Sequence, residues 1–374
     1  MFNFKKEDLR NIDYWIVLSM FALIGIGILA ISSATSYSGD MSTLKDQFLF
    51  FIMGLILMFF VMAIDYHLLG EWYLPIYILI NLVLLSVFFI GKDVNGATRW
   101  INIGPVSLQP SEFAKIGIIL CTAKLLEKYN DKINTLSSIL IIGLFQFLPF
   151  ILVNRQPNLS TSLVILGILV VQLFVSKLDL KIMLTTAGIG IVSAGIILSY
   201  VIGNPNQKIL PSYQRDRIIT KIHGGDNLGE NYQTNQSVHA IGSGGLEGKG
   251  LYEGAISQLN YLPESHNDFI VAIIAEEFGF IGILIVLGII LFMIARGLWI
   301  AHAAPDNFGK FIIVGYMGMI AMQTFVNMGV VTSLLPNTGL PLPFISYGGS
   351  SLWANMIGMG LVLNVGMRKE KSMF

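Results

Sequence analysis

The sequence is poor in charged residues and contains a single cysteine. Charged side chains make up 12% of the 374 residues, whereas a soluble globular domain carries about a quarter. One cysteine, Cys121, excludes an intramolecular disulfide framework and a metal cluster built from cysteines. The packing of the segments must therefore stabilise the fold without covalent crosslinks.

An excess of charge of one sign is also missing. The 23 Lys and Arg residues balance 23 Asp and Glu residues, so the chain lacks the basic field with which nucleic-acid-binding proteins neutralise phosphates. We expect no nucleic-acid partner. Hydrophobic residues are abundant instead: they make up 54% of the chain, and the mean hydropathy is +0.70. This composition is typical of an integral membrane protein.

Long apolar runs predict the architecture, because a bilayer core about 30 Å thick needs about 20 apolar helical residues to cross it. The first run has no small-residue cleavage site after it, so we expect it to be retained as a helix. The sequence predicts an all-α integral membrane protein, a single polytopic membrane domain over residues 1–374 with ten transmembrane helices. The ten runs lie near residues 14–34, 47–65, 72–91, 110–126, 137–153, 159–176, 181–202, 268–296, 309–334 and 349–367.

The distribution of Lys and Arg predicts the orientation. An even number of spans places both termini on one side. If that side is the cytoplasm, thirteen basic residues lie inside and four lie in the short outer loops, as the positive-inside rule requires. We therefore expect both termini to be cytoplasmic. The large polar loop, residues 203–267, is then extracytoplasmic and joins the seventh and eighth helices.

The stretch YLPESHNDFIVAIIAEEF, residues 261–278, places polar side chains directly before an apolar helix. Glu264, His266 and Asp268 fall within five positions, and the following run carries Glu276 and Glu277. A carboxylate in the first turn of a membrane helix lies beside water and near the positive end of the helix dipole. The pattern indicates a site for chemistry on a substrate that arrives from the bilayer.

A second polar segment, GKDVNGATRWINIGPVSLQPSEFAK, precedes the fourth predicted helix. Arg99 and Trp100 suit a membrane interface, where a basic group meets headgroup phosphate and an aromatic ring anchors. Anchoring alone would also explain them. Glu112 and Lys115 are three residues apart and share one helix face, so they can pair within the membrane. A functional pair and a structural ion pair both remain open.

Two patches of the large loop are informative. The first, SYQRDRIITK, gathers Arg215, Arg217 and Lys221, either as a solvated basic face or as a cradle for phosphate, which guanidinium groups bind in pairs. The second, AIGSGGLEGKGLYEG, is rich in glycine. It is not a nucleotide P-loop, because Gly250 follows Lys249 where Ser or Thr belongs. We expect a tight turn against the membrane surface.

The segment LLPNTGLPLPFISYGGSS, near the end of the chain, cannot form a regular helix because of its prolines and its Gly-Gly pair. Irregular backbone at membrane depth must line a cavity or be covered by protein. We expect this segment to form the wall of the site opposite Asp268.

Four separated stretches carry a resemblance to a known family. They are RWINIGPVSLQPSEFAK, RQPNLSTSLVI, YLPESHNDFIVAIIAEEFGFIG and LLPNTGLPLPFISYGGSS. In sequence and in order they resemble the signatures of the SEDS family, the shape, elongation, division and sporulation proteins RodA, FtsW and SpoVE. The short termini and ENYQTNQSVHAIGSGGLEGKGL are more similar to RodA than to FtsW. One departure is Asn267, where the family pattern usually has Thr.

The resemblance implies a peptidoglycan glycosyltransferase of the bacterial cytoplasmic membrane. Such an enzyme polymerises lipid II into glycan strands on the outer face, releases undecaprenyl diphosphate and serves cell-wall elongation and cell shape. It also implies that Asp268 is the essential acid. As a general base, Asp268 would activate the GlcNAc 4-hydroxyl of an incoming lipid II for inverting attack on the lipid-linked MurNAc.

The remaining site residues are expected to bind the substrate. The leaving diphosphate needs basic partners, with Glu112 orienting the lysine among them, and aromatic rings could stack on sugar or lipid. The substrate-binding candidates are Arg99, Trp100, Glu112, Lys115, Arg215, Arg217, Tyr261 and His266. The scattered histidines show no metal spacing, so no protein metal site is predicted. Carboxylates near a diphosphate could nevertheless share a loosely held Mg²⁺ or Mn²⁺ ion.

The expected partners are membrane lipid, a class B penicillin-binding protein and other elongation-complex proteins, as the resemblance implies. Two other functions stay open. A lipid II flippase, or another transporter of lipid-linked substrates, would use Glu112, Lys115 and Glu276 as an ion or headgroup path. A non-catalytic scaffold would have no need of buried charge. The ionisable cluster at the outer edge and the lack of paired halves favour the enzyme.

Overall fold

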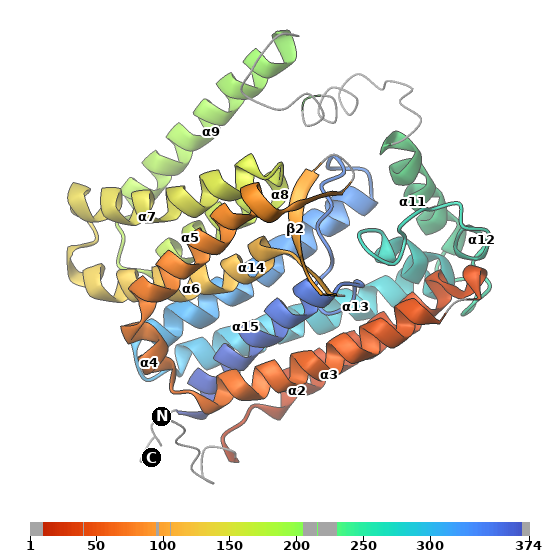
Figure 1. The fold of residues 1–374 in the computed structure, drawn as a ribbon, viewed down its shortest axis with the longest axis horizontal. Coiled ribbons are helices and arrows are strands. Elements are labelled where there is room, and N and C mark those ends of the chain that lie inside the picture. Colours follow the sequence, from red (N-terminus) through yellow and green to blue (C-terminus); the bar gives the residue numbers. More distant parts are fainter. Residues whose placement is uncertain are drawn as a thin grey trace.

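The structure, a computed structural model, describes residues 10–39, 41–94, 97–104, 106–204, 215 and 230–368. It is built mainly from long helices, most of which run roughly alongside one another (Figure 1). The helices are α2 (Tyr14–Ala34), α3 (Ser42–Ala63), α4 (Tyr66–Glu71), α5 (Tyr73–Ile90), α6 (Pro110–Tyr129), α7 (Leu136–Arg155), α8 (Leu159–Val175), α9 (Leu180–Gly203), α11 (Glu230–Gly244), α12 (Ala255–Gln258), α13 (Ile270–His302), α14 (Asn307–Val331) and α15 (Gly349–Met367). Two short 3-10 helices are η1 (Ser36–Ser38) and η2 (Asn130–Lys132).

A helix lies at each of the ten predicted runs. Among the described residues, seven helices are long and apolar enough to cross a membrane, namely α2, α3, α5, α7, α9, α13 and α14. Helix α8 has 17 residues and is shorter. Charged side chains such as Glu112 and Lys115 keep α6 out of this set, and α15 carries Asn355 and Asn364 within its apolar run. The helical membrane architecture is therefore confirmed, whereas the count of ten spans stays a prediction.

The fold is not entirely helical, so the all-α prediction was incomplete. Strands β1 (Lys92–Val94), β2 (Ala97–Ile103) and β3 (Val106–Leu108) form an antiparallel sheet in the order β1-β2-β3. In its register Asn102 lies opposite Ser107. These strands are three to seven residues long, so the apolar-run criterion that detects membrane helices does not detect them.

The large predicted loop also contains regular structure. Helices α11 and α12 lie within it, and α11 is tied to the end of α14, where Ser237 Oγ donates to Val331 O over 2.8 Å. The eighth predicted helix, expected at 268–296, is α13 and runs from Ile270 to His302. The described part of the loop therefore contains packed helices.

Helix α13 is broken at Gly279, whose φ of 67° and ψ of −164° are non-helical. The glycine-rich turn supplies partners for the interrupted backbone. Phe280 N donates to Gly245 O over 3.0 Å, and Gly250 N donates to Glu277 O over 3.0 Å. Unsatisfied peptide groups are costly at membrane depth. The turn therefore stabilises the break. A tight turn is present as expected, and its place against the membrane surface stays a prediction.

The centre of the bundle is formed by α6, α14 and α15, whose side chains are mostly buried. Gln172 of α8 joins three helices there, because its Nε2 donates to Ile119 O over 3.0 Å and to Phe311 O over 3.1 Å. Gly315 makes room for this amide, since a Cβ at that position would lie 2.6 Å from Nε2. Polar side chains thus fix the helix register inside an apolar core.

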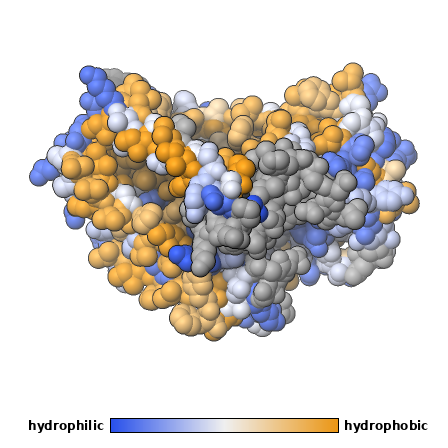
Figure 2. All heavy atoms as spheres, turned by 90° about the horizontal axis from the view of Figure 1, so that it is seen from above, coloured by the Kyte–Doolittle hydropathy of each residue, from blue (hydrophilic) through white to orange (hydrophobic). Residues whose placement is uncertain are grey.

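The outer surface is rich in apolar side chains. In Figure 2 hydrophobic residues cover much of the visible face, and hydrophilic residues lie toward the two ends and in smaller groups near the middle. Phe89 and Leu144, for example, are 80% and 67% exposed. Such large exposed apolar areas are costly in water. They indicate a surface that faces lipid.

The start of α2 and the end of α15 lie at one end of the bundle, which we call the terminal end. Asn11 Nδ2 donates to Met367 O over 3.3 Å, and Arg296 Nε lies 2.7 Å from Asp13 Oδ2. We call the opposite end, where α13 and α15 begin, the loop end. The shared terminal end agrees with an even number of membrane crossings.

Candidate active site

Asp268 lies at the loop end, two residues before α13 begins, and is partly exposed. Its main-chain carbonyl accepts a hydrogen bond of 2.9 Å from Asn327 Nδ2 of α14. Its carboxylate lies against Gly339, since a Cβ at Gly339 would be 3.3 Å from Asp268 Oδ2. Gly339 has a φ of +67°, which disfavours any side chain there. The segment predicted to form the opposite wall is thus confirmed beside Asp268.

The same wall contacts His266. Tyr347 N donates to His266 O over 2.9 Å, and the two rings meet edge to face with centroids 5.3 Å apart. Burial lowers the pKa of His266, while Glu264, whose Oε2 lies 3.9 Å from His266 Nε2, partly opposes that shift. Burial raises the pKa of Tyr347, and the charges of Asp46 and Glu264 act in the same direction. Both rings are therefore favoured in their uncharged forms beside Asp268.

Glu112 and Lys115 form the predicted pair in the first turns of α6. Lys115 Nζ lies 2.9 Å and 3.0 Å from the two carboxylate oxygens, and the side chains are 3% and 1% exposed. A buried ion pair is tolerated only when both charges are well satisfied. The bidentate contact meets this requirement and holds the lysine at a fixed place.

Polar contacts connect the start of α6 to the wall beside Asp268. Asn158, which caps α8, donates from Nδ2 to Ser111 Oγ over 3.4 Å. Two residues later, Ser160 Oγ donates to Thr338 O over 2.9 Å, and Thr338 directly precedes Gly339. The starts of α6 and α8 and the wall therefore meet in one polar region at the loop end.

Arg99 and Trp100 lie on β2. Arg99 Nη2 donates to the carbonyl of Pro157, directly before the cap of α8. Trp100 is partly exposed and pairs in register with Lys92 of β1. The structure thus gives Arg99 a contact within the protein, at the edge of the polar region. A phosphate contact of Arg99 stays a prediction.

The predicted basic cradle is described only in part. Arg215 Nε donates to Val201 O over 3.2 Å, near the end of α9, a helix that projects away from the bundle in Figure 1. Arg217 and Lys221 lie outside the described residues. Tyr261 is 49% exposed, and its N–H donates to Ile256 O over 3.1 Å. These contacts join Arg215 and Tyr261 to neighbouring segments, so their roles in the site stay predictions.

The Glu276 carboxylate binds the glycine-rich turn and the start of α12. It lies 2.7 Å from Lys249 Nζ and accepts from the N–H groups of Ile256 and Ser257, over 3.1 Å and 3.3 Å. The Glu276 side chain is fully buried. A carboxylate with these three partners anchors the loop, and this arrangement removes the reason for including Glu276 in a transport path.

The sequence analysis missed Asn327, although a signal was present. The residue is a buried amide one turn after Gln323 in α14, and polar groups at membrane depth are costly unless they have a function or a partner. It is 1% exposed, and its partners are the carbonyls of Asp268 and Leu340. Both carbonyls come from irregular segments distant in sequence, so the sequence could not identify them.

Within the part of the chain that the structure describes, no three His, Cys, Asp or Glu side chains come close enough together to hold a metal ion. The protein residues alone therefore offer no metal cluster there. A divalent cation shared with a diphosphate stays a prediction.

Comparison with known proteins decides the family. A sequence profile described as "Cell cycle protein", for FtsW, RodA and SpoVE, matches residues 12–371. The chain belongs to the SEDS family. This SEDS protein is 36% identical over 378 residues to the probable peptidoglycan glycosyltransferase FtsW of Trichlorobacter lovleyi, covering 96% of this chain and 94% of the relative. It is also 36% identical over 362 residues to the peptidoglycan glycosyltransferase MrdB of Escherichia coli, with the same coverage.

Solved structures of the family have the same fold. One belongs to a study titled "Structural coordination of polymerization and crosslinking by a peptidoglycan synthase complex", with a TM-score of 0.79 and 29% identity over 95% of this chain and 97% of that one. The other is the rod shape determining protein RodA of Thermus thermophilus, with a TM-score of 0.71 and 28% identity over 96% and 98%. The predicted resemblance to the SEDS family is confirmed.

Proposed function

We propose that this SEDS protein is a peptidoglycan glycosyltransferase that polymerises lipid II into glycan strands and releases undecaprenyl diphosphate, for cell-wall elongation and cell shape. The observation that carries the proposal is the placement of Asp268, two residues before the start of α13 and against the wall around Gly339. It occurs in a chain that is 36% identical, over nearly its whole length, to curated peptidoglycan glycosyltransferases.

The proposed setting is the bacterial cytoplasmic membrane, crossed ten times by a single membrane domain. The contact of Asn11 with Met367 supports an even number of crossings. The thirteen basic residues of the inner segments against four in short outer loops support cytoplasmic termini. The loop end, with the 203–267 loop and Asp268, is then extracytoplasmic, where a substrate exposed at the outer face can reach it.

In the proposed reaction Asp268 is the general base. The 4-hydroxyl oxygen of GlcNAc forms a bond to the anomeric carbon of the lipid-linked MurNAc, and the bond from that carbon to the diphosphate oxygen breaks with inversion. The hydroxyl proton moves to the Asp268 carboxylate. A sugar hydroxyl is a poor nucleophile at neutral pH, and a positioned base contributes about 10² to 10⁴ in rate.

Basic side chains are proposed to stabilise the leaving diphosphate. The candidates are Lys115, Arg99, Arg215 and Arg217, because charge that grows in the transition state is stabilised by fixed cations. The bidentate contact of Glu112 supports its role in orienting Lys115. Trp100 and Tyr261 would stack on sugar or lipid, and His266 would hydrogen-bond the substrate.

A class B penicillin-binding protein and other elongation-complex proteins are the proposed partners, together with membrane lipid. The support is the fold similarity, at a TM-score of 0.79, to a chain from a peptidoglycan synthase complex. A partner that crosslinks strands would receive the polymer at the same membrane face.

The deciding experiment is gel-resolved polymerisation of labelled lipid II by the purified protein with its cognate penicillin-binding protein, which a β-lactam keeps inactive. Wild type is compared with Asp268→Asn. Long strands that disappear in the variant would support a polymerase with its base at Asp268. No strands from wild type, together with transfer of lipid II across liposome bilayers, would instead indicate a flippase. Chelation by EDTA in the same assay tests the requirement for Mg²⁺ or Mn²⁺.

A further inference from the structure

Asn327 makes two hydrogen bonds with one nitrogen. Its Nδ2 donates to Asp268 O over 2.9 Å and to Leu340 O over 2.8 Å, and the side chain is 1% exposed. Asp268 precedes α13 and Leu340 lies in the irregular wall, so neither carbonyl is in the middle of a helix that would supply its hydrogen bond. Buried carbonyls of this kind need a donor, and Asn327 supplies one to both.

The two carbonyls belong to opposite sides of the candidate site. Asp268 carries the proposed base, and Leu340 follows Gly339, the residue against which the Asp268 carboxylate lies. Asn327 itself is on α14, whose inward face is buried in the centre of the bundle. A single planar amide on a packed helix therefore fixes the separation between the base and the wall.

We propose that Asn327 is a positioning residue for glycosyl transfer: it holds the main chain of Asp268 and that of the wall in register, so that the carboxylate faces the attacking hydroxyl. The inference rests on the proposed function. A displacement of a reacting group by about 1 Å can reduce a rate about 10²-fold. The contacts described for Asn327 are with main-chain carbonyls, so we assign its effect on the reaction to the position of Asp268.

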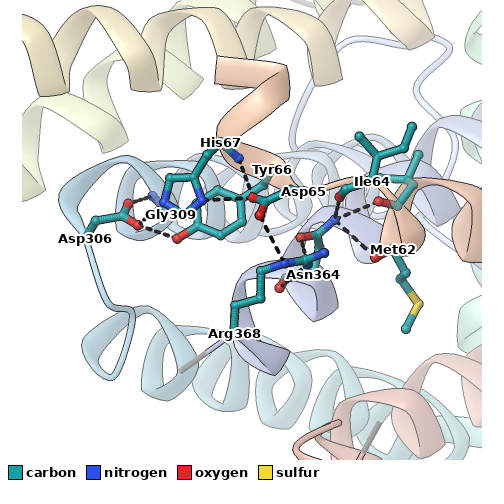
Figure 3. Close-up of polar contacts among 10 residues, drawn as sticks. Met62, Ile64, Asp65, Tyr66, His67, Asp306, Gly309, Asn364 and Arg368 are labelled. Atoms are coloured by element: carbon teal, nitrogen blue, oxygen red, sulfur yellow. Dashed lines mark hydrogen bonds and ion pairs between the residues drawn. The ribbon is translucent and has the colours of Figure 1, made fainter. Parts of the chain in front are cut away.

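The chain contains a matched control. Asn364 of α15 is fully buried, and its Nδ2 donates to Val61 O over 2.7 Å and to Ile64 O over 2.5 Å at the end of α3 (Figure 3). It is the same residue type and also donates to main-chain carbonyls distant in sequence, although both carbonyls belong to one segment and its Oδ1 accepts from Arg368. It lies at the terminal end, however, away from the proposed base. Loss of Asn364 should therefore affect folding and leave catalysis by the folded protein unchanged.

The experiment compares Asn327→Leu and Asn364→Leu in the full-length protein with its β-lactam-blocked penicillin-binding protein. Leucine keeps the approximate volume and removes the donor. For Asn327→Leu we expect kcat per folded molecule to fall about 10²-fold, with KM for lipid II changed less than about 3-fold. For Asn364→Leu we expect a lower Tm and a kcat within about 2-fold of wild type. Folded protein is quantified by size-exclusion chromatography before each assay.

A third variant, Asn327→Asp, adds a pH readout that a merely structural role would not give. Its carboxylate cannot donate when ionised, but its protonated form regains one donor. The ratio of kcat for this variant to kcat for wild type should rise as the pH falls from about 8 to about 6, because protonation restores the donor at position 327. The same ratio for Asn327→Leu should stay flat.

Each outcome has one meaning. A kcat for Asn327→Leu within about 2-fold of wild type, or equal losses of kcat per folded molecule in the leucine variants of Asn327 and Asn364, would overturn the positioning role. A ratio for Asn327→Asp that stays flat with pH would do the same. Failure of the proposed function is a separate result, because wild type itself would then make no strands while remaining folded.

Discussion

The two ends of the bundle each contain a buried asparagine bridge and nearby carboxylates, but they are fixed in different ways. At the terminal end the side-chain carboxylates carry the contacts, as Figure 3 shows. The Asp306 carboxylate accepts hydrogen bonds from the hydroxyl of Tyr66 and, over 2.7 Å, from Gly309 N. It also lies 3.0 Å from His67 Nε2. Asp65 Oδ1 lies 2.8 Å from His67 Nδ1.

The loop end also uses side-chain carboxylates, at Glu276 and Glu112, but around Asp268 several hydrogen bonds run to main-chain carbonyls. Those of His266, Asp268, Thr338 and Leu340 each accept a hydrogen bond from a distant segment. A main chain held in this way positions the side chain that it carries. The comparison indicates that a buried asparagine and nearby carboxylates can serve stability alone, as at the terminal end. At the loop end the same kinds of residue lie beside the proposed base and can serve chemistry.

The largest expected effect is on strand formation, and it compares a carboxylate of the loop end, Asp268, with one of the terminal end, Asp306. Asp268→Asn should reduce strand formation at least about 10²-fold while the protein still folds and binds lipid II, since the base is lost. Asp306→Ala should keep activity per folded molecule within about 2-fold but lower stability by about 1 kcal/mol, because Asp306 caps α14. Polymerisation gels and thermal unfolding check the two variants. Substantial polymerisation by Asp268→Asn would remove the base from the proposal.

The second prediction concerns buried charge. Lys115→Met should destabilise the protein by about 3–5 kcal/mol, because it leaves the buried Glu112 carboxylate without its partner. Adding Glu112→Gln should recover part of that loss. Lys177→Met is the control, since Lys177 and Asp131 pair on the surface with side chains 66% and 86% exposed, where a pair contributes about 0–1 kcal/mol. Equal destabilisation by both lysine variants in thermal unfolding would contradict the comparison.

A third prediction tests the space beside Asp268. Gly339→Ala should cost about 1–2 kcal/mol, because its φ of +67° is unfavourable for a side chain. It should also lower kcat, since the new Cβ would lie 3.3 Å from Asp268 Oδ2. Gly25→Ala, in α2 with no neighbour within 4 Å of the added Cβ, should leave kcat unchanged and raise stability by up to about 1 kcal/mol, because alanine is the better helix former. If the Gly339 variant matched the Gly25 variant in steady-state kinetics, the wall would not constrain the base.

The smallest effect is a pH dependence at the loop end. Burial holds the pKa of His266 below its ordinary 6.5, so the unfolded chain takes up this proton at higher pH than the folded protein does. Stability should therefore fall as pH decreases from about 6.5 toward the lower folded pKa, and then level off. His266→Gln should remove that slope from plots of Tm against pH. An unchanged slope in the variant would assign the dependence to another group.

Much of the fold could be predicted from the sequence, because a membrane helix is a local property of about 20 residues. The ten runs all correspond to helices. The short strands of β1 to β3 and helix α11 could not be predicted in that way. Their stability depends on packing against α5, α6, α13 and α14, which come together only in the fold.

The same distinction holds for the candidate site: some of its features follow from local sequence, and others depend on contacts made only in the fold. Asp268 and the pairing of Glu112 with Lys115 follow from local spacing, and the proline-rich wall follows from its inability to continue a helix. Asn327 could not be assigned a role, because its two partners lie 59 and 13 residues away in the sequence. Arg99 was expected to meet phosphate, and its contact with Pro157 O depends on a sheet that the sequence analysis did not foresee.

The break in α13 has an evolutionary consequence. Gly279 and the turn around Gly248 approach so closely that a Cβ at Gly248 would lie 2.1 Å from Glu277 O, and one at Gly279 would lie 2.4 Å from Gly248 N. A mutation at either position alone would separate turn from helix, and a shortened turn would leave the broken helix without partners. The two glycines should therefore be inherited as one unit, retained together or lost together among descendants of this gene.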